Sequence, residues 1–233
     1  MIELFEVSGE NPSLVFSPFC WRVRLALAHK GLKANFHSVA YSDKTQIAFS
    51  GQELLPVIRD SQTILHDSFA IISYLDRQYP QATLDLNSIA GQRALLIDRV
   101  VHQDLLIGLF RLLVLRILPL LSPTDSAYFR NKHEKLLGMT LETFADAAIG
   151  MKLVERALQP LEAQLQSAPF FDGDAPGAID VLIGGFFFWA WVLRLTPWEH
   201  YPGVSAWFTK MLAGYESVQG SINRAPLSGP VAS

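Results

Sequence analysis

The sequence has only one cysteine, Cys20, among its 233 residues. A single thiol cannot form a disulfide within the chain, and it excludes zinc sites built on pairs of thiolates. Residues 1–20 also lack the basic start and the continuous apolar stretch of a signal peptide, because three glutamates interrupt them. Together these absences predict a cytoplasmic protein.

Long hydrophobic runs and a dominant charge are missing as well. The longest apolar run, residues 181–193, is bounded by Asp180 and Arg194 and is well below the roughly 20 residues that span a bilayer. The chain carries 19 basic and 22 acidic residues, a net charge of −3, and no basic block. We therefore expect no nucleic-acid partner and no membrane partner, and the charge pattern favours a small molecule.

Strand and helix patterns alternate in the first 80 residues. Apolar residues tend to alternate with glutamates near the start, as in a half-buried strand. Ser17-Pro18 then places a capping hydroxyl before a proline at the first helical position, which predicts the start of a helix. The expected elements are strands at 2–7, 35–41, 57–58 and 63–65, and helices at 18–30 and 67–79, with a loop or short helix before the third strand.

Beyond residue 87 the sequence predicts helices and no strand. Helical spacing runs through 88–121, 125–167, 178–195 and 203–216, and prolines separate these segments. Periodicity lapses over residues 81–87, which predicts a linker. The expected fold class is therefore α/β followed by all-α: an N-terminal βαβαββα domain at 1–80, the linker at 81–87 and a helical domain at 88–233.

Ser17 is the first candidate for chemistry. A helix amino terminus offers free N–H groups and a partial positive charge, and a serine hydroxyl there can donate a hydrogen bond to a thiolate. This combination is what a thiol-activating site needs. The alternative is that Ser17 only caps its own helix.

Two later segments have the same double interpretation. Leu55-Pro56 either begins a strand, where a proline is tolerated, or forms a cis bond that turns the Leu55 backbone toward a bound peptide. Asp67-Ser68 either caps an ordinary helix or binds an α-amino-acid head, with the aspartate facing the ammonium group and the serine with the helix terminus facing the carboxylate.

The order of these features resembles the glutathione transferase superfamily over nearly the whole chain. The stretch 17–31, SPFCWRVRLALAHKG, is similar to the bacterial β-etherase-like and related fungal branch, and it also has features of the zeta, or maleylacetoacetate isomerase, branch. The long loop at 8–16, Pro18 and Phe19 favour the first branch. Gly177 departs from the superfamily pattern, which usually has a serine or threonine cap there, three residues before Asp180.

The resemblance implies a thioredoxin-like domain that binds glutathione and a helical domain that supplies a pocket for a second substrate. It assigns Ser17 to thiolate activation, and the backbone of Leu55, before a cis Pro56, to pairing with the cysteine of glutathione. Asp67 and Ser68 would hold the γ-glutamyl end, and Gln52 would assist. The implied partners are glutathione as co-substrate, without a metal, a hydrophobic electrophile and a second copy of the chain in a homodimer.

Several alternatives stay open. The leading function is a glutathione transferase acting on an electrophilic, aromatic or ether substrate; the others are a glutathione-dependent cis-trans isomerase of the maleylacetoacetate type and a non-catalytic binding protein of the same fold. Cys20 is either a buried core residue or a redox-active thiol. Lys44 is either a ligand of the glycine carboxylate or simply solvated. The aromatic cluster at 186–191 is expected to form part of the core, with a wall of the substrate pocket as the second interpretation. Arg111 and Arg116 belong either to the pocket wall or to a charged helix face.

Overall fold

The structure is a computed structural model that describes residues 1–226. Four strands form one mixed sheet in the order β2-β1-β3-β4. β1 runs parallel to β2 and antiparallel to β3, and β3 forms a hairpin with β4. The predicted strands and hairpin are confirmed. The elements of this part are β1 (Ile2–Val7), α1 (Pro18–His29), β2 (Ala34–Val39), the short 3-10 helix η1 (Thr45–Ser50), β3 (Val57–Asp60), β4 (Thr63–His66) and α2 (Ser68–Gln78).

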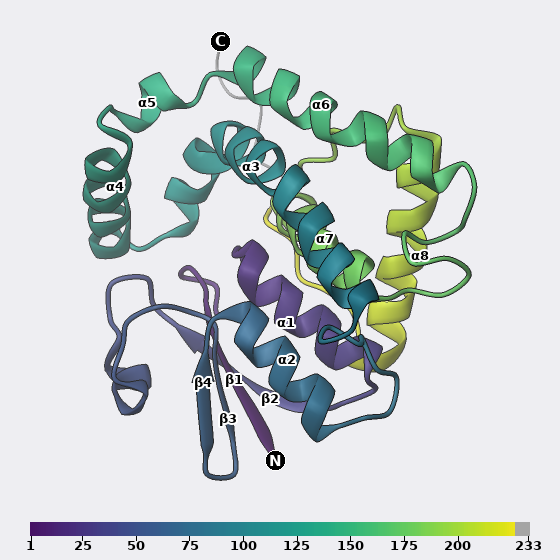
Figure 1. Cartoon of the computed structure of the whole chain (residues 1–233). Coiled ribbons are helices and arrows are strands. Elements are labelled where there is room, and N and C mark those ends of the chain that lie inside the picture. The colour runs from purple at the N-terminus through teal and green to yellow at the C-terminus, as the bar shows by residue number, and fades with distance from the viewer. Residues whose placement is uncertain (227–233) are drawn as a thin grey trace.

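Both faces of the sheet are covered. Side chains alternate between the two faces along a strand. Leu4 and Ile58 join the main core, on the face covered by α1 and α2, whereas Phe5 and Val57 form a small second core with Ile47 of η1. Figure 1 shows α1 and α2 side by side over the sheet, with the helical part of the chain beyond them.

The described chain after α2 contributes helices and no strand to the sheet. The helical spacing at 125–167 is divided among three helices, because Gly138 adopts a positive φ of 68° and Thr140 and Asp146 each cap a new helix. The helical domain was predicted to reach residue 233, and residues 227–233 lie outside the described residues. The helices are α3 (Ile89–Ile117), the 3-10 helix η2 (Leu118–Leu120), α4 (Pro123–Leu137), α5 (Leu141–Phe144), α6 (Ala147–Leu165), α7 (Ala178–Val192) and α8 (Pro202–Gln219).

A buried lysine fixes the chain where it leaves α2. The Nζ atom of Lys30 donates to the carbonyl oxygens of Tyr79, Gln81 and Ala82, at 2.8, 3.1 and 3.2 Å. The same ammonium group forms an ion pair with Asp76 at 3.0 Å. The start of the connection to α3 is therefore anchored to the first part of the chain.

Two contacts position α1 against the helical part. Gly185 of α7 packs so closely on α1 that a Cβ atom there would lie 2.5 Å from the carbonyl oxygen of Pro18, and one at Gly184 would lie 2.9 Å from a Leu25 methyl carbon. The buried side chain of Arg22 also pairs with buried Asp98 of α3 at 2.5 Å. The amino end of α1 is therefore held by α3 and α7.

The glycine at the start of α7 has a steric cause. The buried carboxylate of Asp180 accepts hydrogen bonds from the backbone N–H of Gly177 and from Nε1 of Trp207, at 2.9 and 2.7 Å. A second carboxylate, that of Asp172, accepts from the N–H of Ile179 at 2.7 Å, which is the bond that a cap side chain would otherwise make. A Cβ atom at position 177 would lie 2.7 Å from Asp172, so glycine leaves room for this substitute cap.

Candidate active site

Ser17 is the N-cap residue of α1, with an extended backbone. Its Oγ atom accepts from the N–H of Cys20 at 3.4 Å, a long hydrogen bond, so the hydroxyl hydrogen remains available to another acceptor. Pro18 has no N–H, and the N–H of Phe19 has no acceptor among the residues that the structure describes. A hydroxyl, an N–H group and the positive end of a helix therefore meet at one place, which suits an anion.

Cys20 lies one turn further along α1 and is fully buried. Burial, together with nearby Glu6, raises the pKa of its thiol to about 12. A protonated, inaccessible thiol is a weak nucleophile. Of the two alternatives for Cys20, the structure therefore supports the core residue.

The Leu55-Pro56 peptide bond is cis. The N–H and carbonyl oxygen of Leu55 make no hydrogen bond within the described part of the chain, although β3 begins only two residues later. An unpaired N–H and C=O on one residue can pair with an extended peptide. Leu55 borders the same pocket as Ser17, so such a peptide would pass beside the start of α1.

The other predicted glutathione ligands lie outside the wall of that pocket. Asp67 is exposed at the start of α2, where its φ is 72° and its carboxylate accepts from the N–H of Ala70 at 2.9 Å, and Ser68 beside it is buried. The amide of Gln52 donates to Ser50 Oγ and to a carbonyl of its own loop. In this arrangement the side-chain N–H groups of Gln52 are both engaged by its own loop.

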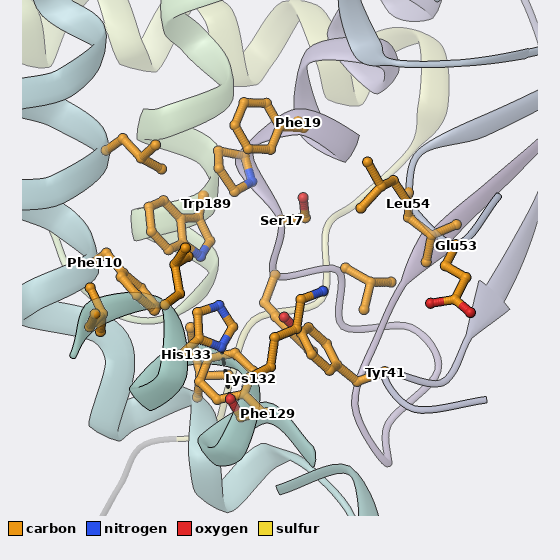
Figure 2. A pocket seen from close by; sticks show the side chains of 18 of the residues that line it. Ser17, Phe19, Tyr41, Glu53, Leu54, Phe110, Phe129, Lys132, His133 and Trp189 are labelled. Atoms are coloured by element: carbon orange, nitrogen blue, oxygen red, sulfur yellow. Dashed lines mark hydrogen bonds between the residues drawn. The ribbon is translucent and has the colours of Figure 1, made fainter. Parts of the chain in front are cut away.

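A pocket of about 480 Å³ lies beside Ser17, between the loops of the sheet and helices α3, α4 and α7 (Figure 2). Its volume is within the range of small-molecule sites. The wall is mostly apolar and aromatic, which suits a hydrophobic molecule. The larger apolar residues of the wall are Phe16, Phe19, Leu54, Leu55, Leu106, Ile107, Phe110, Ile117, Phe129, Leu136, Leu137, Phe144 and Trp189.

Two lysines approach one aromatic ring at the edge of this pocket. The Nζ atoms of Lys44 and Lys132 lie 5.4 and 5.5 Å from the ring centre of Tyr41. Lys44 is half-buried and donates to the carbonyl oxygen of Ala40 at 3.0 Å, so it is not simply solvated. Burial and the neighbouring Lys132 lower the pKa of Lys44 from its usual value. Two converging cations favour an anion in this part of the pocket.

Part of the pocket could have been read from helical spacing. Phe129, Lys132, His133, Leu136 and Leu137 follow the i, i+3, i+4, i+7, i+8 pattern of one helix face, and all five line the pocket from α4.

The two arginine candidates for the pocket wall are used elsewhere. Arg111 donates to the carbonyl oxygen of Phe144 at 2.7 Å, and Arg116 donates to that of Arg194 at 3.0 Å. Neither arginine borders the pocket.

Residues 1–226 contain neither a membrane-spanning helix nor a metal-binding cluster. No helix in this part is both long enough and apolar enough to cross a membrane. Nor does this part contain a group of three or more histidine, cysteine, aspartate or glutamate side chains placed to hold a metal ion.

Comparison with known proteins identifies the family. Residues 13–83 match the model for the glutathione S-transferase N-terminal domain, and residues 94–215 match that for the glutathione S-transferase C-terminal domain. The chain belongs to the glutathione S-transferase family.

Individual relatives agree with this assignment. Glutathione S-transferase Z1 of Arabidopsis thaliana is 37% identical over 86 residues, a match that covers 33% of this chain and only 39% of that protein. Glutathione transferase GSTFuA3 from Phanerochaete chrysosporium has a TM-score of 0.80 at 24% identity, covering 92% of this chain and 97% of its own. The glutathione S-transferase CsGST63524 of Ceriporiopsis subvermispora, solved in complex with glutathione, has a TM-score of 0.79 at 21% identity, covering 97% and 99%. These two structures share the fold.

Proposed function

We propose that this protein is a glutathione transferase that ionises glutathione at Ser17 and directs the thiolate at a hydrophobic electrophile in the neighbouring pocket. The observation that carries the proposal is that Ser17, Phe19 and Leu55 border one pocket, where the Phe19 N–H and the backbone of Leu55 have no partner within residues 1–226. The tripeptide would pair with Leu55, with its γ-glutamyl end at Asp67 and Ser68. The reducing cytoplasm is the proposed location.

The energies of these groups are large enough for the task. A thiol with a pKa of about 8.5 must lose roughly 2 pKa units to be mostly ionised at pH 7, which corresponds to about 2.7 kcal/mol. A hydrogen bond to a charged group supplies about 1.5–3 kcal/mol, and a helix amino terminus supplies about 0.3–1 kcal/mol. The hydroxyl of Ser17 and the terminus of α1 together meet this requirement.

The test is the substitution Ser17→Ala. We expect the pKa of bound glutathione, followed by the ultraviolet absorbance of the thiolate, to rise by about 1–2 units, and kcat/KM with an activated aryl chloride to fall roughly 10- to 100-fold. Ser122→Ala is the matched control, because Ser122 caps α4 through the N–H of Asp125 and does not border the pocket. An unchanged thiolate titration in the Ser17 variant would remove this residue from the role.

A glutathione-dependent cis-trans isomerase is the second candidate, supported by the resemblance of residues 17–31 to the zeta, or maleylacetoacetate isomerase, branch. Turnover of a maleyl-type substrate, with no conjugation of the aryl chloride, would favour it. A protein that binds glutathione without either reaction would instead be a non-catalytic member of the family.

A homodimer is the proposed assembly. The exposed side chains of Ile89, Leu96 and Val100 on α3 are 75%, 62% and 70% accessible, and their spacing places them on one side of the helix. Large exposed apolar side chains that share a helix face favour an interface. Sedimentation analysis of the full chain would test this: wild type should sediment as a dimer, and a Leu96→Glu, Val100→Glu variant as a monomer.

A further inference from the structure

The indole nitrogen of Trp189 is a buried donor with no acceptor within residues 1–226. Trp189 is only 3% exposed and borders the pocket beside Ser17. Figure 2 shows its nitrogen on the side of the ring that faces the inside of the pocket. Buried N–H groups are almost always hydrogen-bonded in folded proteins. An acceptor atom on a molecule bound in the pocket would satisfy the hydrogen-bonding capacity of this N–H group.

His133 offers the opposite kind of group. Its Nδ1 atom lies 2.9 Å from the carbonyl oxygen of Phe129. Because a carbonyl oxygen can only accept, Nδ1 must carry the hydrogen. Burial lowers the pKa of His133 below its usual value, so the ring is neutral at pH 7 and its Nε2 atom is an acceptor. Figure 2 shows this outer nitrogen toward Trp189, away from the bond to Phe129.

One donor and one acceptor on the same wall match a hydroxyl group, which both accepts and donates. The oxygen of a methyl ether could accept a hydrogen bond from Trp189, but it has no hydrogen to donate to His133. A carboxylate could also accept from Trp189, but its oxygen lone pairs would face the lone pair of Nε2 and be repelled. The surroundings are aromatic: the ring of Phe110 lies 5.1 Å from that of His133 and 6.4 Å from that of Trp189. A flat aromatic molecule suits such walls.

We propose that the second substrate is a hydroxylated aromatic molecule whose hydroxyl group lies between Nε1 of Trp189 and Nε2 of His133. This inference rests on the proposed function insofar as it treats the pocket as the site of the second substrate. It adds two specificity-determining residues and the chemical class of the molecule. The hydroxyl serves recognition, and the electrophilic carbon is elsewhere on the same molecule.

The test measures binding without turnover. Isothermal titration is carried out with 2-naphthol and with 2-methoxynaphthalene, which share the ring system and differ in the hydroxyl hydrogen, in the presence of S-methylglutathione, which cannot react. Wild type should bind the naphthol roughly 10-fold more tightly than the ether, the ratio expected for one well-made hydrogen bond. Because no thiol is transferred, a failure of the proposed catalysis does not affect this result.

Two variants separate the hydrogen bonds from the packing. Trp189→Phe and His133→Phe keep an aromatic ring and remove the nitrogen atoms, and each should reduce the ratio to roughly 1–2 while changing affinity for the ether by less than about 2-fold. Trp191→Phe is the matched control, since Trp191 lies two residues along α7 and does not border the pocket. It should leave the ratio unchanged.

Several outcomes would overturn the inference. They are equal affinity of wild type for the two naphthalenes, no measurable binding of the naphthol, or tighter binding of 2-naphthoate than of the naphthol. Equal losses for naphthol and ether in His133→Phe would also overturn it. Half-buried His133 provides the decisive variant if the Trp189 substitution prevents folding.

Discussion

Replacing Gly185 with alanine tests how α7 positions the amino end of α1, where the proposed catalytic residue Ser17 lies. The added Cβ atom would lie 2.5 Å from the carbonyl oxygen of Pro18 and 2.6 Å from Cγ of Arg22, whereas ordinary contacts begin near 3.4 Å. A backbone oxygen in a helix cannot rotate away, so α1 must retreat by roughly 1 Å. Ser17, the residue before Pro18, moves with it.

The size of the effect follows from two opposing terms. Overpacking costs about 1–3 kcal/mol, and alanine is favoured over glycine in a helix by about 1 kcal/mol. We therefore expect Gly185→Ala to reduce the free energy of unfolding by up to about 2 kcal/mol in urea titrations. A displacement of about 1 Å at a reacting group costs up to 100-fold in rate, so kcat/KM should fall roughly 10- to 100-fold.

The neighbouring glycine is the matched control. A Cβ atom at Gly184 would lie 2.9 Å from Cδ1 of Leu25 and 3.7 Å from Cε of Met211, and both are ends of flexible side chains that can move. Gly184→Ala should therefore stay within about 1 kcal/mol of wild type in stability and within roughly 3-fold in kcat/KM. Wild-type stability and an unchanged glutathione thiolate pKa in Gly185→Ala would refute the reasoning.

Three further predictions concern single residues. Asp180→Ala should lower the free energy of unfolding by about 4 kcal/mol. Four donors, which include Nε1 of Trp207, lose a buried acceptor, and each loss costs about 1 kcal/mol or more. A loss of stability below about 1 kcal/mol in urea titrations would contradict this. Gly177→Ser should destabilise by about 1–2 kcal/mol although serine is a good cap, because its Cβ collides with Asp172; a raised Tm would be the opposite result. If Lys44 holds the glycine carboxylate of glutathione, KM for glutathione should rise about 3- to 10-fold in Lys44→Met. In wild type, KM should also rise as the pH passes upward through the lowered pKa of Lys44, because the cation is lost there. The same pH profile in wild type and variant would exclude this role.

Most of the architecture could be predicted because local signals agreed with one another. The alternation at the start of the chain gave β1 with its observed bounds, and Ser17-Pro18 marked the start of α1. The division of 125–167 into three helices was harder, since apolar spacing continues through the breaks and only Gly138 interrupts it. Periodicity reports which residues are buried, and caps decide where a helix stops.

The pocket could be predicted less well, for a physical reason. Ser17 and Leu55 belong to local motifs, so the residues next to them in the sequence were enough to select them as candidates. Trp189 of α7 and His133 of α4 border one pocket only because distant parts of the chain fold together, and neither carries a signal that separates a pocket residue from a core residue. The unsatisfied indole N–H of Trp189 is visible only when all its neighbours are placed.

Two stretches of the chain line the pocket, and they differ in how freely their residues can be exchanged. Residues 7–55 contribute the serine, the cis-proline loop and the sheet side, and residues 106–189 contribute the larger share of the aromatic rings. Exchanges at the pocket-lining positions of α3 and α4 can therefore alter which molecules fit while the ion pair of Asp98 with Arg22 and the surroundings of Ser17 stay in place. The sequence of α7 is more constrained, because α7 presents Trp189 to the cavity and packs Gly185 against the backbone of α1. In a lineage of such enzymes, new substrates should arise first through changes in α3 and α4.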